Sequence, residues 1–184
     1  MSEQAIYSDP FTDLDGHWHW LREKPDHWRL AEGGLEIRVE PGLADTVINA
    51  LLRVAPDRSA GTYVFEVTVS NLHAPTQQYE QVGITWYAGG KPVFKLVKEL
   101  IDGDVYIIPG KCPVADEPVR LRLTVDGAHW KAEYKPESAE AFATAAEGDL
   151  PAPDGDQVSL QCYNGPEDAE HWVRFEDFAI SQLG

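Results

Sequence analysis

Residues 17–28 read HWHWLREKPDHW, and a Gly33-Gly34-Leu35 strand start follows them. Two interpretations of this stretch exclude each other. The spacing of His17 and His19 is typical of a metal site on a strand, because alternate strand residues point to the same side. Three tryptophans ahead of a Gly-Gly-Leu strand start are instead typical of the opening of an all-β sandwich. The rest of the chain has to decide between them.

Apolar and polar residues alternate along most of the chain, which predicts β-strands. In residues 119–125, for example, the odd positions are valine or leucine and the even ones are arginine or threonine. Asp126-Gly127, between two such runs, is the clearest hairpin signal. The predicted strands are 35–39, 47–54, 63–69, 81–87, 93–98, 105–108, 119–125, 129–134, 158–163 and 171–180. The alanine-rich segment 136–148 predicts a short helix.

About ten or more short strands at regular spacing predict one all-β domain over residues 1–184, a two-sheet antiparallel sandwich or jelly roll. The chain carries 31 acidic against 15 basic residues and a net charge of −16. Such a charge repels phosphate backbones and anionic membranes, so neither nucleic acid nor a membrane is expected as a partner. The sequence has no secretion signal and no membrane-length apolar run, which predicts a cytoplasmic location. It identifies no protein partner.

Cys112 and Cys162 match no metal-binding pattern. Cys162 lies between apolar positions of a predicted strand, so a buried free thiol is expected there, with a disulfide as the open alternative.

Short motifs recur in a recognisable order along the chain. They are Trp18-x-Trp20-x-Arg22-Glu23, Trp28-x-Leu30, Gly33-Gly34-Leu35, LLR at 51–53, YEQVGITWY at 79–87, FKL at 94–96, VRLRL at 119–123 and FEDFAI at 175–180. This order, over about residues 13–180, resembles a bacterial group of concanavalin A-like β-sandwich domains similar to the C-terminal domain of family 43 β-xylosidases. The Ala-rich segment after Tyr134 departs from that group. The resemblance implies a sandwich with one concave face, often working beside carbohydrate-active enzymes.

Strand alternation selects the residues that could line such a face. Sugar recognition needs flat rings against C–H faces and planar polar groups for paired hydroxyls. The candidate ligand-binding residues are Arg53, Gln81, Tyr87, Lys95 and Tyr163. Arg53 is included because it ends a Leu-Leu pair, where a charge is not expected to be wholly buried. The alternative is that they are ordinary solvent-facing strand residues. The resulting hypothesis is a noncatalytic carbohydrate-binding or carbohydrate-associated module with an oligosaccharide as its partner.

Two enzymatic alternatives stay open. A glycoside hydrolase on the same sandwich needs a close carboxylate pair, which Glu66, Glu80, Glu99 and Glu133 could form only across strands. A cupin-type metal enzyme would use His17, His19 and Glu23. It is weakened by Phe11, where the motif has glycine, and by the missing second motif. No catalytic residue and no cofactor are predicted. A structural calcium ion held by Asp13, Asp15 and Asp177 is a further hypothesis.

Overall fold

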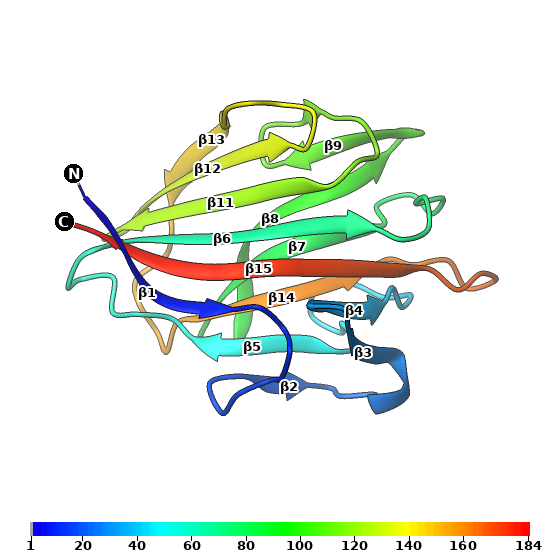
Figure 1. Cartoon of the computed structure of the whole chain (residues 1–184), viewed down its shortest axis with the longest axis horizontal. Helices are drawn as coiled ribbons and strands as arrows, with labels where there is room; N and C mark the ends of the chain where they lie inside the picture. Colours follow the sequence, from blue (N-terminus) through cyan, green and yellow to red (C-terminus); the bar gives the residue numbers. More distant parts are fainter. Residues whose placement is uncertain (1) are drawn as a thin grey trace.

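A computed structural model describes residues 2–184 and arranges their strands in two antiparallel sheets packed face to face (Figure 1). We call them sheet A and sheet B. Strands β6, β11 and β15 of sheet A pass in front of β7, β8 and β14 of sheet B in Figure 1. The two ends of the chain lie together, because the first strand pairs with the last. The predicted all-β, two-sheet sandwich is therefore confirmed.

Sheet A has eight strands and sheet B has seven. In sheet A the order is β13 (Ala143–Asp149), β12 (His129–Pro136), β11 (Val119–Asp126), β6 (Thr62–Asn71), β15 (Trp172–Leu183), β4 (Gly34–Arg38) and β3 (Trp28–Ala31), with β1 (Glu3–Asp9) also paired to β15. In sheet B the order is β10 (Cys112–Pro113), β9 (Asp104–Ile108), β8 (Lys91–Ile101), β7 (Gln81–Ala88), β14 (Gln157–Tyr163), β5 (Ala50–Val54) and β2 (His19–Leu21). A single 3₁₀ turn, η1 (Pro25–His27), is the only helical element among residues 2–184.

The main core lies between the sheets and is built from alternate residues of each strand. Val82, Ile84 and Trp86 of β7 all face inward and are fully buried, as their parity predicts. The Trp86 ring meets Phe65 of sheet A edge to face, with 5.3 Å between ring centroids. Because the inward residues are fixed by this core, the remaining residues of each strand must face outward.

The predicted hairpin at Asp126-Gly127 is confirmed, since Asp126 pairs with His129 at the start of β12. The predicted helix in 136–148 is wrong. Its second half forms β13, in which Ala143 pairs with Tyr134. The backbone groups of β12 need a partner at this edge of the sheet, and that requirement outweighs the intrinsic helical preference of the alanines.

The tryptophans of the opening stretch support the sandwich interpretation. Trp18 is buried against Phe178 with 5.0 Å between ring centroids, and its Nε1 donates to Asp9 Oδ2 at 2.7 Å. Trp20 packs on Trp28 at 4.7 Å, where the edge strand of sheet B meets the edge strand of sheet A. These rings close one side of the sandwich.

The three side chains of the cupin hypothesis have separate partners. His17 lies outside β2 and contacts Asp15, whereas His19 begins β2 and contacts Gln157 at 3.3 Å. Glu23 accepts a hydrogen bond from the Trp28 indole. These three side chains therefore do not form the metal-ligand triad of the cupin alternative.

Both cysteines are free. The Cys162 side chain is buried, as predicted, and burial raises the pKa of its thiol. Between residues 2 and 184 we find no helix long and apolar enough to cross a membrane.

Candidate functional site

The outer face of sheet B carries a row of polar and aromatic side chains across four strands. Tyr163 on β14 is opposite Gln81 on β7, Gln81 is opposite Glu99 on β8, and Glu99 is opposite Tyr106 on β9. We call these four residues the cross-strand row. Their neighbours along each strand face the core, so the row's side chains lie on the opposite face.

Lys95 joins this row by reaching along β8. Its Nζ donates to Gln81 Oε1 at 2.8 Å and to Glu99 Oε2 at 3.0 Å, and it lies 5.9 Å from the centroid of the Tyr163 ring. Gln81 Nε2 donates in turn to the Tyr79 carbonyl at 2.8 Å and to Glu99 Oε1 at 3.3 Å. An ammonium has three donors, and two are used within this face. One donor remains for a ligand oxygen.

A second polar group lies beside the row. Tyr87 Oη donates to Gln161 Oε1 at 2.8 Å, and Ser159 Oγ donates to the same oxygen at 2.9 Å. Gln161 Nε2 and Thr85 Oγ1 are buried without a partner within the described part of the chain. Burial is the main cause that raises the pKa values of Tyr87 and Tyr163. Both phenols are therefore neutral at physiological pH.

The loop before β5 forms one wall of this face. Val47 packs with Leu52, Tyr87 and Tyr163 in a small apolar cluster separate from the main core. Arg22 Nε donates to the Val47 carbonyl at 2.6 Å and fixes the loop to the opening stretch. The Trp-rich region therefore contributes to the site indirectly, by holding this wall.

Asn49 strengthens the same attachment. Its side chain accepts from the Lys24 amide at 2.7 Å and donates to the Lys24 carbonyl at 3.1 Å. Asn49 is fully buried and has a φ of 58°, a conformation that asparagine tolerates better than most residues.

Between this wall and β8 lies a pocket of about 370 Å³. The members of the pocket that matter most are Gln81, Lys95, Glu99, Tyr163 and the exposed ring of Tyr79. Volumes of ~300–1,000 Å³ are usual for small-molecule sites. A concave space with an exposed ring and convergent polar groups can accept a small polar ligand.

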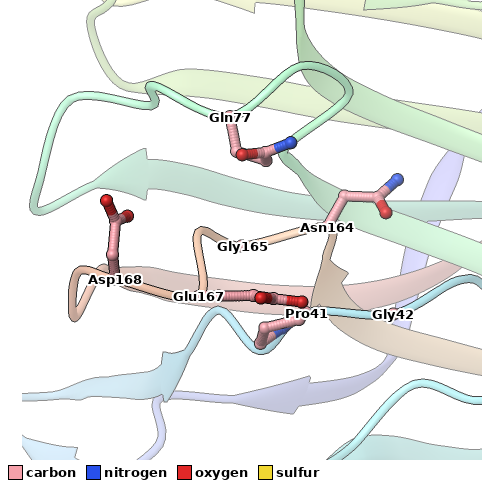
Figure 2. Close-up of a pocket in the computed structure, with 7 residues that line it drawn as sticks. All are labelled: Pro41, Gly42, Gln77, Asn164, Gly165, Glu167 and Asp168. Atoms are coloured by element: carbon pink, nitrogen blue, oxygen red, sulfur yellow. The ribbon is translucent and has the colours of Figure 1, made fainter.

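Two further pockets adjoin it. One of about 360 Å³ shares Lys95 and Tyr163 with it and reaches Thr85. The other, of about 580 Å³, shares Asn164 and lies among the loops at the end of β14. Figure 2 shows this second pocket, with Glu167 and Asp168 on the loop after β14 and Gln77 on the loop above.

The loop at this end is held by close backbone contacts. The Asn164 amide donates to the Gly42 carbonyl at 3.1 Å, and the Gly165 amide donates to the Glu40 carbonyl at 2.9 Å. A Cβ at Gly165 would lie 1.9 Å from the Val39 carbonyl oxygen. Only glycine permits this approach.

The structure brings together four of the five predicted ligand-binding residues. Gln81, Tyr87, Lys95 and Tyr163 share the outer face of sheet B. Arg53 does not join them, and its predicted place on that face is wrong. It shares parity with the core residue Leu51 and is 8% exposed.

The Arg53 guanidinium lies 3.6 Å from the centroid of the Tyr7 ring, inside the sandwich. We predicted an outward guanidinium for Arg53 because burying its charge between the sheets is costly. Stacking on an aromatic ring offsets part of the cost of burial, and burial lowers the pKa of Arg53.

The carboxylates proposed for a hydrolase lie apart. Glu66 pairs with Arg122 at 3.2 Å and Glu133 with Lys131 at 2.9 Å, both on the outer face of sheet A. Glu80 is buried and contacts His171 at 2.7 Å. Only Glu99 of the four lies in the pocket, so none of the suggested cross-strand pairs forms there.

No group of three His, Cys, Asp or Glu side chains within residues 2–184 is arranged to hold a metal ion. Of the residues in the calcium hypothesis, Asp15 accepts hydrogen bonds from the Tyr7 hydroxyl and the His17 amide. Asp13 and Asp177 are exposed. The calcium ion stays a prediction.

Sequence reasoning missed two features of the site. Tyr79 was not selected because it precedes its strand, and its φ of 67° could not be inferred from the pattern. Asn164 was missed because it follows β14 in a loop. The Gly-Pro pair at 165–166 was the available signal for a constrained turn there.

No protein-family model matches the chain, and no curated protein sequence matches it. Solved structures do. The GH43 protein BlXynB from Bacillus licheniformis is 19% identical with a TM-score of 0.73, over 96% of this chain and 39% of its own. The xylan beta-1,4-xylosidase from Bacillus halodurans C-125 is 14% identical with a TM-score of 0.72, over 95% and 39%. The alginate lyase from Klebsiella pneumoniae is 11% identical with a TM-score of 0.61, over 88% and 86%.

The chain thus spans about two fifths of the length of the two GH43-related structures. At these identities the likeness concerns the fold. By its fold, the chain is a two-sheet antiparallel β-sandwich similar to a part of these two structures, consistent with the family resemblance in its sequence motifs.

Proposed function

We propose that this chain is a noncatalytic carbohydrate-binding module and that its ligand lies on the outer face of sheet B. The observation that carries the proposal is the hydrogen-bonded group of Lys95, Gln81 and Glu99 beside the Tyr163 ring, at the base of a 370 Å³ pocket. Hydroxyl pairs on a sugar ring suit planar amide and carboxylate groups. The half-exposed Tyr79 offers a ring for stacking at the rim.

Three features favour binding over catalysis. Both Glu99 oxygens already accept hydrogen bonds, one from Gln81 and one from Lys95. Neutral phenols with raised pKa values, such as that of Tyr163, are poor general bases. A retaining hydrolase also needs two carboxyl groups ~5–5.5 Å apart across the scissile bond, and of the four glutamates considered for such a pair only Glu99 lines this pocket.

Hydrolysis is the second candidate, because Asp45 lines the same pocket as Glu99. Asp45 lies on the exposed loop that forms the wall of the site. If this pair were catalytic, the chain would release reducing sugar from an oligosaccharide, and Glu99→Gln or Asp45→Asn would abolish that release. A chain that binds the sugar without cleaving it supports the first candidate.

Calorimetric titration with xylo- and gluco-oligosaccharides tests the proposal. Lys95→Met should weaken binding about tenfold or more, because a charged hydrogen-bond donor is lost. Lys131→Met is the matched control. Both lysines are about one third exposed and pair with a glutamate on their own sheet, at 3.0 Å for Lys95 and 2.9 Å for Lys131. Equal losses in both variants, or no binding by the unaltered chain, would refute the proposal.

A further inference from the structure

The three pockets of the site adjoin one another through shared lining residues, and we call this row of pockets the groove. The pocket at Thr85 shares Lys95 and Tyr163 with the pocket that contains Gln81, which we call the central pocket. The central pocket shares Asn164 with the pocket of Figure 2, which we call the outer pocket. Each has a volume that a small ligand fills. A single sugar ring would occupy one pocket and leave the others to water. A chain of rings could contact all three.

Most of the charged side chains that line this groove are acidic. Among the residues that line the three pockets, Lys95 is the only cation, and it is already paired with Glu99. Three carboxylates remain without a cation among the lining residues: Asp45 in the central pocket, and Glu167 and Asp168 in the outer one. All three are exposed, so they face an incoming ligand.

The polar groups without charge lie along the same path. Gln77 and Asn164 present amide side chains to the outer pocket (Figure 2), and Gln81 presents one to the central pocket. Amides pair with hydroxyls as both donor and acceptor. They lack the positive charge and the paired N–H donors with which an arginine guanidinium binds a carboxylate.

We infer that the groove takes a neutral, linear oligosaccharide of several rings and rejects polyuronates. The inference rests on the proposed function and narrows its ligand class. An anionic chain would bring carboxylates into a groove that carries Asp45, Glu167 and Asp168, and the one cation among the lining residues, Lys95, is already paired with Glu99. Like charges brought together across an interface strongly oppose binding.

Titration of the full chain with matched hexasaccharides tests this inference. A neutral xylo- or gluco-hexasaccharide should bind about tenfold or more tightly than a hexauronate. It should also bind more tightly than its own disaccharide, because it reaches further pockets. High salt should narrow the difference between neutral and anionic ligands, since exposed charges are screened.

Glu167→Gln together with Asp168→Asn should strengthen hexauronate binding relative to binding of the neutral hexasaccharide, and so reduce the ratio of the two affinities. Glu147→Gln together with Asp149→Asn is the matched control. It removes the same two charges from exposed positions on β13, which belongs to sheet A. Equal gains in both pairs would assign the rejection to net charge rather than to the groove, and would overturn the inference.

Hexauronate binding as tight as that of the neutral chain would overturn it as well, and so would equal affinity for the neutral disaccharide and hexasaccharide. Neither result would affect the proposed function, because a sugar would still bind. Failure of every saccharide to bind would refute both.

Discussion

The outer faces of the two sheets have the same strand geometry but use their polar groups differently. On sheet A, arginines and glutamates form a mutual network, with Arg174 bonded to both Glu36 and Glu176 at 3.1 Å. Across the described strands of sheet B, the outward ion pair is Lys95–Glu99 alone, and the outward polar side chains of β7 and β14 are amides and hydroxyls. Two of the latter have buried atoms without partners, Gln161 Nε2 and Thr85 Oγ1.

If the proposed function is right, this difference explains why the ligand lies on sheet B and not on sheet A. A charged network that satisfies itself gains little from a neutral ligand, which would have to displace existing ion pairs. Amides and a single free ammonium donor gain hydrogen bonds from such a ligand at little cost. The wall at Val47 adds the concave shape that the face of sheet B would otherwise lack.

The largest effect is expected from closing the approach at Gly165. Gly165→Ala would place a methyl group 1.9 Å from the Val39 carbonyl, and the loop after β14 must then shift. We expect the free energy of unfolding to fall by about 1–3 kcal/mol. The affinity for an oligosaccharide should also fall, because Asn164, which lines the groove, is next to Gly165. Urea denaturation and calorimetric titration measure the two effects.

Gly16→Ala is the control for this change, because a Cβ there meets nothing within 4 Å and its φ is not left-handed. It should leave both stability and binding unchanged. A Gly165→Ala chain as stable as the Gly16→Ala chain would contradict the described contact.

A pair of threonines compares the two faces directly, with a smaller expected effect. Thr68 on sheet A accepts a hydrogen bond from Arg120 Nη1 at 3.2 Å, whereas the buried Thr85 hydroxyl on sheet B has no partner among residues 2–184. Thr68→Val should cost about 0.5–1.5 kcal/mol, and Thr85→Val should be neutral or stabilising. Chemical denaturation measures both. A larger loss at Thr85 would mean that its hydroxyl is paired in solution.

The smallest effect concerns alkaline pH. Burial raises the pKa of Tyr163, and the group keeps its proton in the folded chain when the unfolded chain has lost it. Its contribution to stability is therefore fully present below the unfolded tyrosine pKa of about 10, and decreases as the pH rises above that value. Urea midpoints measured up to pH ~11 should fall less steeply for Tyr163→Phe than for the unaltered chain. If the urea midpoints of the two chains fall equally with pH, Tyr163 does not have a raised pKa in the folded chain.

Strand alternation predicted the fold and most of one face, and its failures have physical causes. Parity placed Gln81, Lys95 and Tyr163 together because the core of a sandwich fixes the inward residues. The same parity also points Arg53 inward. We predicted an outward side chain because burying a charge is costly, and the sequence does not reveal that Arg53 stacks on Tyr7. The helix expected in 136–148 failed for a related reason, since the partner strand of an edge is chosen by tertiary contact.

Loops account for the rest of what could not be predicted. The wall at Val47 depends on contacts to Arg22 that are 25 residues distant in the chain, and no local pattern encodes them. Tyr79 and Asn164 line the groove from turns whose positive φ values become visible only in three dimensions. Nor can parity alone distinguish the two outer faces, because both alternate in the same way.

The most direct test of the account is a map of backbone amide shifts during titration with a neutral hexasaccharide. If the ligand lies on the outer face of sheet B, the amides of Gln81, Lys95 and Asn164 should show saturable shifts. The amides of Glu66 and Arg122, on the outer face of sheet A, should show none. Shifts confined to sheet A, or no shifts on either face, would contradict it.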